Sequence, residues 1–116
     1  MAITYVGEAE DLLTEVTLPT FQVGDLAIVQ AYRLAVDVSP SLPSGWTTIA
    51  SAGIGTDPTS ISRRTGYRVL ASGDTTTGVW TNATGVAVIV LRGARLTSPI
   101  GTISAASTAS SSTITC

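Results

Sequence analysis

The stretch GVAVIVLRG, residues 85–93, decides the fold class of this chain. Its six consecutive apolar residues, 86–91, are too few for an ordinary helix and far too few to cross a bilayer. Val86, Val88, Ile89 and Val90 are β-branched, which favours an extended backbone. Because side chains alternate across a strand, a strand that is apolar throughout needs cover on both faces. We therefore predict a central strand of a packed β domain.

The rest of the chain predicts further short strands separated by turns. Gly24-Asp25 and Gly73-Asp74 are turn signals, and the Pro-, Ser- and Gly-rich stretches 37–45 and 52–59 are typical of loops. The expected strands are residues 2–6, 14–18, 26–34, 47–51, 61–71, 75–81 and, at the end of the chain, 113–115. With the stretch at 85–93 this makes about eight short strands and no substantial helix. The pattern indicates an all-β, antiparallel β-sandwich of jelly-roll type, with a small barrel as the alternative.

The length of 116 residues supports one domain. We place a β-sandwich domain at residues 1–96. Residues 97–116 are rich in serine and threonine and poor in large apolar side chains. They are interpreted as a carboxy-terminal arm, a last edge strand or the start of a further β unit. The opening residues 1–6 lack the basic and long apolar regions of a signal peptide, so we expect a chain that stays in the cytoplasm or leaves it within a particle.

Charge is sparse and does not favour nucleic acid as a partner. The formal net charge is −2, only 12% of residues are charged, and all six basic residues are arginines. Arg63, Arg64 and Arg68 form the only local basic cluster, which is too small for a nucleic-acid footprint. These three arginines are candidate interface residues, and a solvated face is the equal alternative. Arg92 is expected to bind terminal carbonyl groups or a carboxylate.

No constellation for catalysis or metal binding is recognisable. The chain has no histidine and one cysteine, Cys116, so Ser-His-Asp and Cys-His sets are excluded. Glu8, Glu10, Asp11 and Glu15 offer paired carboxylates for glycoside hydrolysis or calcium binding. An exposed acidic loop is the favoured interpretation of these residues, with an acidic helical turn as its alternative. In an exposed loop both carboxylates of a pair stay ionised, so neither could serve as the acid in glycoside hydrolysis. We expect no enzymatic activity, no cofactor and no metal.

The two tryptophans are candidates for stacking on a sugar ring. Trp46 and Trp80 could serve a carbohydrate-binding module, but the aromatic content of 5% is low for one. Core packing is the favoured interpretation of both rings.

Several segments, taken in order, resemble a β-sandwich module of tailed-bacteriophage structural proteins. They are Gly24-Asp25-Leu26, Pro43-Ser44-Gly45-Trp46-Thr47, Thr65-Gly66-Tyr67-Arg68-Val69, Gly73-Asp74, Trp80 and Val88-Ile89-Val90-Leu91-Arg92-Gly93-Ala94. The resemblance covers residues 3–94. Such modules occur in head decoration, head-fibre and tail-associated proteins, and the family offers no catalytic residues to carry over.

This resemblance implies a virion protein without enzymatic activity. The leading expectation is a capsid decoration or cement protein that binds the outer capsid surface and stabilises the shell. Its partners would be the major capsid protein or another virion protein, with no nucleic acid and no membrane. A homo-oligomer is expected, and a trimer is the best guess by analogy. The alternative is a tail- or fibre-associated module that binds a host-surface glycan.

Overall fold

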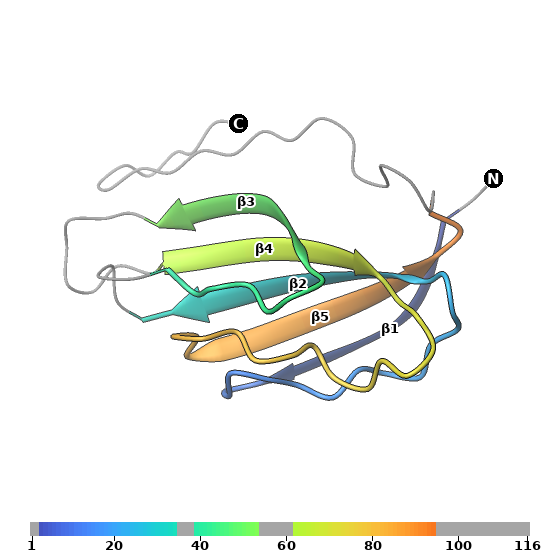
Figure 1. Cartoon of the computed structure of the whole chain (residues 1–116), viewed down its shortest axis with the longest axis horizontal. Coiled ribbons are helices and arrows are strands. Elements are labelled where there is room, and N and C mark those ends of the chain that lie inside the picture. The colour runs from blue at the N-terminus through green and yellow to red at the C-terminus, as the bar shows by residue number, and fades with distance from the viewer. Residues whose placement is uncertain (1–2, 35–38, 54–61, 95–116) are drawn as a thin grey trace.

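The protein is all-β in the part that the computed structural model describes, which is residues 3–34, 39–53 and 62–94. The strands are β1 (Thr4–Asp11), β2 (Leu26–Arg33), β3 (Thr47–Gly53), β4 (Ser62–Val69) and β5 (Gly85–Arg92). They form one antiparallel sheet in the order β1-β5-β2-β4-β3 (Figure 1). The all-β prediction is confirmed, and the described residues contain five strands. None of their segments is a helix long and apolar enough to cross a membrane.

The stretch at 85–93 forms an interior strand, as its composition predicts. β5 pairs with β1 on one side and β2 on the other. Val86, Val88 and Val90 are buried, whereas Ile89 is 38% exposed. The expectation that both faces of this strand are fully covered is therefore wrong, because only the face with the three valines lies in the core.

We call the two sides of the sheet the covered face and the open face. On the covered face, Ala27, Val29 and Ala31 of β2 lie opposite Val90, Val88 and Val86 of β5. Residues that pair across an antiparallel sheet share a face, so the register also assigns the open face. Its residues include Glu8 and Glu10 of β1, Ala87 and Ile89 of β5, Ile28, Gln30 and Tyr32 of β2, and Arg63, Thr65 and Tyr67 of β4. Leu26 of β2 lies on the same face but is only 3% exposed, so the face is covered at that end.

The strand order explains why one face is covered. β1 and β2 run in the same direction with β5 between them, and β4 and β5 likewise flank β2. Such pairs cannot be joined by a hairpin and need a connection that crosses the sheet. Both crossing segments, 12–25 and 70–84, run over the same face of the sheet (Figure 1). Their side chains Val16, Leu18, Leu70 and Trp80 join the strand valines in one buried cluster.

The crossing segments are held to each other by backbone hydrogen bonds. The amide of Leu18 donates to the carbonyl of Thr75, and that of Thr77 to the carbonyl of Val16, each at 2.9 Å. An isolated bridge between Thr17 and Thr76 adds to these contacts, and a second one joins Ser41 to Thr81. The predicted strands 14–18 and 75–81 are thus irregular segments, since Pro19 and the positive φ of Gly78 interrupt an extended ladder.

The acidic stretch near the amino terminus is also corrected. Glu8, Glu10 and Asp11 lie in β1, where they pair with Ile89, Ala87 and Val86 of β5. The apolar edge of β5 supplies a partner that outweighs the weak β propensity of these acids, and charges are common on edge strands. The predicted arm 97–116, the strand 113–115 and parts of the loops 37–45 and 52–59 lie outside the described residues.

Candidate functional site

The three candidate interface arginines do not form one cluster. Arg64 and Arg68 lie opposite Ala31 and Ala27 of β2, on the covered face, whereas Arg63 lies opposite Tyr32 on the open face. Alternation along β4 therefore splits the cluster that the sequence suggested.

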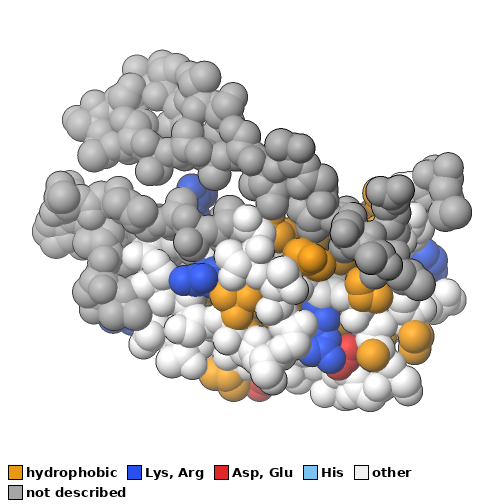
Figure 2. All heavy atoms as spheres, turned by 45° about the horizontal axis from the view of Figure 1, so that its top comes forward, with side chains coloured by type: hydrophobic (Ala, Val, Ile, Leu, Met, Phe, Trp, Pro, Cys, Tyr) orange, Lys and Arg blue, Asp and Glu red, His pale blue; other side chains and the backbone are white. Residues whose placement is uncertain are grey.

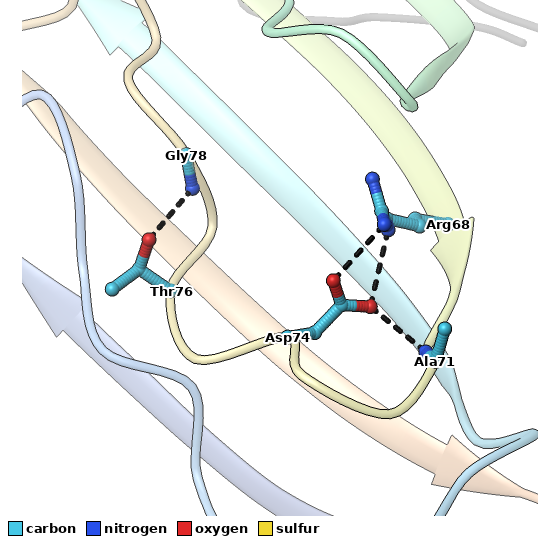
Figure 3. Close-up of polar contacts among 5 residues, drawn as sticks. All are labelled: Arg68, Ala71, Asp74, Thr76 and Gly78. Atoms are coloured by element: carbon cyan, nitrogen blue, oxygen red, sulfur yellow. Dashed lines mark hydrogen bonds and ion pairs between the residues drawn. The ribbon is translucent and has the colours of Figure 1, made fainter.

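The two arginines of the covered face bind within the protein. Arg64 donates from Nε to the carbonyl oxygen of Pro40 at 2.8 Å. Arg68 donates from Nη2 to Oδ1 of Asp74 at 2.9 Å and from Nε to Oδ2 at 3.3 Å (Figure 3). Arg63 is exposed and has no ion-pair partner among the described residues. Of the three, Arg63 is the one that a partner can reach.

The two tryptophans pack against each other with different exposure. Their ring centroids lie 5.5 Å apart in an edge-on arrangement of 67°. Trp80 is 0% exposed, and its Nε1 donates to the carbonyl oxygen of Thr77 at 3.2 Å. A fully buried ring has no face that a sugar could contact, so Trp80 is no longer a candidate for stacking. Trp46 is half-buried at the edge of the core.

Trp46 borders a polar pocket of about 220 Å³. Both carboxylate oxygens of Asp74 accept hydrogen bonds within the protein, from the guanidinium of Arg68 and from the amide of Ala71 (Figure 3). Thr76 donates to Oε2 of Glu15 and accepts from the amide of Gly78. The other lining residues are Ser44, Gly73 and Thr75. The charged groups of the pocket already accept or donate hydrogen bonds within the protein. A ligand would therefore contact mainly the hydroxyl groups of Ser44 and Thr75 and the edge of Trp46.

A second aspartate–arginine pair lies at the same end of the sheet. Arg92 donates to both oxygens of Asp25, at 2.9 and 2.8 Å, which confirms the expected carboxylate partner. Hydrogen bonds from Arg92 hold the pKa of Asp25 below its ordinary value and outweigh the opposite effect of burial. The same contact raises the pKa of Arg92. This pair fastens the start of β2 to the end of β5 and is a structural element.

The acids of β1 form no enclosed site. Glu8, Glu10 and Asp11 are all exposed. The pKa of Tyr5 is raised, first by partial desolvation of its ring and then by the charge and hydrogen bond of neighbouring Glu8. In the described part of the chain, no group of acidic, cysteine or histidine side chains is placed to hold a metal ion.

The open face is the remaining candidate surface. Ile28 and Ile89 lie side by side at its centre, and shallow depressions surround the small side chain of Ala87. One of these depressions, about 340 Å³, is lined by Gln30, Tyr32, Arg63 and Ala87. Figure 2 shows another side of the molecule, where separate hydrophobic patches lie among several blue groups and one blue and one red group lie against each other. An apolar centre with charges at its rim is the composition of a protein-binding surface.

Comparison with known proteins adds no relative: no family model matches the chain, and no match is found among the curated proteins or the solved structures. Sequence reasoning missed the open face, because GVAVIVLRG shows no alternation that would separate Ile89 from Val88. A signal for this face is nevertheless present in the sequence. If residues 4–11 are interpreted as a strand, the alternation of Glu8 and Glu10 with their neighbours indicates one face that is exposed to solvent.

Proposed function

We propose that this chain is a non-enzymatic structural subunit of a bacteriophage virion, and specifically a capsid decoration protein that binds the outer shell and stabilises it. The open face carries the proposal: it leaves an apolar centre at Ile28 and Ile89 available to another protein. The virion assignment is supported by the ordered segments that resemble phage modules. A jelly-roll sandwich, in which segments 12–25 and 70–84 form the second layer, is the corresponding fold.

The proposed mechanism is stabilisation of the shell by binding. A subunit that binds only the assembled shell lowers its free energy by mass action, without chemistry. The partners are the major capsid protein or another virion protein and further copies of this chain, with a trimer expected by analogy. The 12% charged content suits a protein that buries much of its surface against others.

The first test is copy number in purified particles, measured by quantitative mass spectrometry against the major capsid protein. Hundreds of copies per particle would support decoration of the shell. Between three and a few tens would indicate a tail, fibre or vertex, and absence from particles would overturn the proposal.

A second test asks whether the open face matters for attachment and stabilisation. Particles that lack the chain are incubated with the wild-type protein, with Ile89→Arg or with Val23→Arg, and their thermal release of DNA is measured. Val23 is 69% exposed in the turn before β2 and serves as the matched apolar-to-charged control. Wild type and Val23→Arg should raise the release temperature, whereas Ile89→Arg should not. Equal effects of all three would count against the open face.

A glycan-binding tail or fibre module is the second candidate, favoured by the pocket beside Trp46. A glycan array would test it, with Trp46→Ala as the variant and Arg63→Gln, on the opposite face, as the control. Binding that survives Trp46→Ala would remove stacking on this ring.

A further inference from the structure

Leu26 is buried on the face of the sheet that is otherwise open. The register places it in one row with Tyr5, Leu91 and Val69, on the same face as Ile89. Ile89 lies in the interior of its strand and is 38% exposed, whereas Leu26 is the first residue of its strand and is only 3% exposed. A side chain at the end of a sheet has fewer neighbours within the sheet than one in its interior. The burial of Leu26 therefore requires a cover that lies on the open face.

This cover is separate from the hydrophobic core. Leu26 is buried but does not belong to the core cluster. The described segments that border this end of the sheet pack on the other face, because Leu70 belongs to the cluster and Phe21 and Trp46 lie against it. The neighbours of Leu26 in the sheet flank it and do not lie above it. The cover thus comes from a part of the chain outside the described residues.

The position of Leu26 decides between the segments outside the described residues. Segments 35–38 and 54–61 lie at the opposite end of the sheet, where Ser62 pairs with Arg33 and with Gly53. The amino terminus leads into β1, which β5 separates from β2, and Tyr5 in the same row is 61% exposed. The chain after Ala94, in contrast, leaves the sheet beside Leu26, whose partner in β5 is the last residue but one of that strand.

We infer that the segment after Ala94 folds back over the open face and covers Leu26 with its first large apolar side chains, which are Leu96, Pro99 and Ile100. Gly93 has a φ of +94° and so provides a turn directly after β5. The distance is short, since paired residues on adjacent strands lie about 5 Å apart and an extended chain advances about 3.3 Å per residue.

The composition of the segment suits this contact. Residues 96–116 contain no aspartate, glutamate, lysine or arginine. A neutral segment can lie on apolar surface without burying a charge, which would be costly. The contact makes residues 96–100 part of the folded domain and leaves the centre of the open face, at Ile28 and Ile89, to a partner. The inference is independent of the proposed function and goes beyond it.

Thiol labelling tests whether Leu26 is covered and by what. Leu26→Cys and Ile89→Cys are prepared in the full chain with Cys116→Ser, and circular dichroism serves as the folding control. Leu26 lies outside the core cluster, so the fold should persist. The thiol at position 26 should react at least about tenfold more slowly than that at position 89, because its reaction requires the cover to open. Equal rates at the two positions would overturn the inference.

A second pair of variants identifies the segment. Leu96→Asp with Ile100→Asp should bring the reactivity of position 26 to that of position 89, since a charged segment leaves the apolar surface. Ile114→Asp is the matched apolar-to-acid control and should leave position 26 protected. Protection that survives the double variant would show another cover and overturn the inference.

Disulfide formation provides a test without added charges. Leu26→Cys is combined with Leu96→Cys, Ile100→Cys or Ile114→Cys, again with Cys116→Ser, and oxidised at low protein concentration. Trypsin cleaves after Arg33 and Arg95, so a disulfide joins peptides 1–33 and 96–116 in the mass spectrum. The pairs with positions 96 and 100 should form faster than the pair with position 114, and the reverse order would contradict the inference. Both measurements use the isolated chain, so their outcome is separate from the copy number in particles.

Discussion

Asp25 and Arg92, 67 residues apart in the chain, form a two-pronged ion pair that ties the residue before β2 to the last residue of β5. Asp74 and Arg68 repeat the arrangement at the neighbouring turn. Each aspartate follows a glycine with positive φ and accepts the amide hydrogen of the residue three positions earlier, at 2.8 Å. The two turns therefore share one design and differ mainly in burial.

Burial should decide the cost of breaking each pair. The Asp25 side chain is 3% exposed, against 19% for Asp74. Asp25→Asn leaves a buried contact with Arg92 uncompensated and should lower the free energy of unfolding by about 2–3 kcal/mol. Asp74→Asn should cost only about 1 kcal/mol, because water replaces part of its contact. Urea unfolding of both variants measures the difference, and equal losses would contradict the role given to burial.

Acid should remove the contribution of Asp25. Its pKa in the folded protein lies below the ordinary 3.8, so the unfolded chain binds this proton more tightly. The stabilisation is thus fully present above the unfolded pKa and is lost as the pH falls through the lower folded pKa. We expect the difference in unfolding free energy between wild type and Asp25→Asn to shrink below about pH 4. Urea titrations from neutral pH downward measure it, and a difference that stays constant would disprove this linkage.

Gly66 should be intolerant of any side chain. A Cβ at this position would lie 2.9 Å from Cη2 of Trp80 and 3.1 Å from the carbonyl oxygen of Thr47. Gly66→Ala should therefore cost about 1–3 kcal/mol and change the near-ultraviolet circular dichroism of the tryptophans. Gly73→Ala is the control: space is open there, and only its φ of +93° resists alanine. It should lose stability with an unchanged tryptophan spectrum, and a shifted spectrum in the control alone would refute the packing argument.

The hydroxyl group of Thr77 should make a large contribution to the stability of the fold. Thr77 is fully buried, and its Oγ1 accepts the amide hydrogen of Val16 at 3.1 Å. Thr77→Val keeps the shape but leaves that amide without a partner, at a cost of about 1–3 kcal/mol. The same substitution at half-buried Thr65, on the open face, should change stability by less than about 0.5 kcal/mol. Thermal or urea unfolding of the two variants tests this, and a neutral Thr77→Val would count against it.

Local sequence determined the elements whose signal is strong over a few residues. GVAVIVLRG was bound to form a strand, because its β-branched residues favour extension and its length excludes a helix of ordinary length. Gly24-Asp25 and Gly73-Asp74 could only be turns, because glycine adopts a positive φ without strain and the aspartate binds back to the backbone. In each case the preference acts between neighbours in the chain.

Tertiary structure decided which residues face outward, and with them the candidate site. Glu8 and Glu10 became part of a strand because β5 offered an unpaired edge, and no local preference encodes that partner. Arg63 separated from Arg64 and Arg68, and Ile89 from Val88, because the crossing segments 12–25 and 70–84 cover one face only. A period of two tells which residues share a face, but which face is buried depends on where distant segments pack.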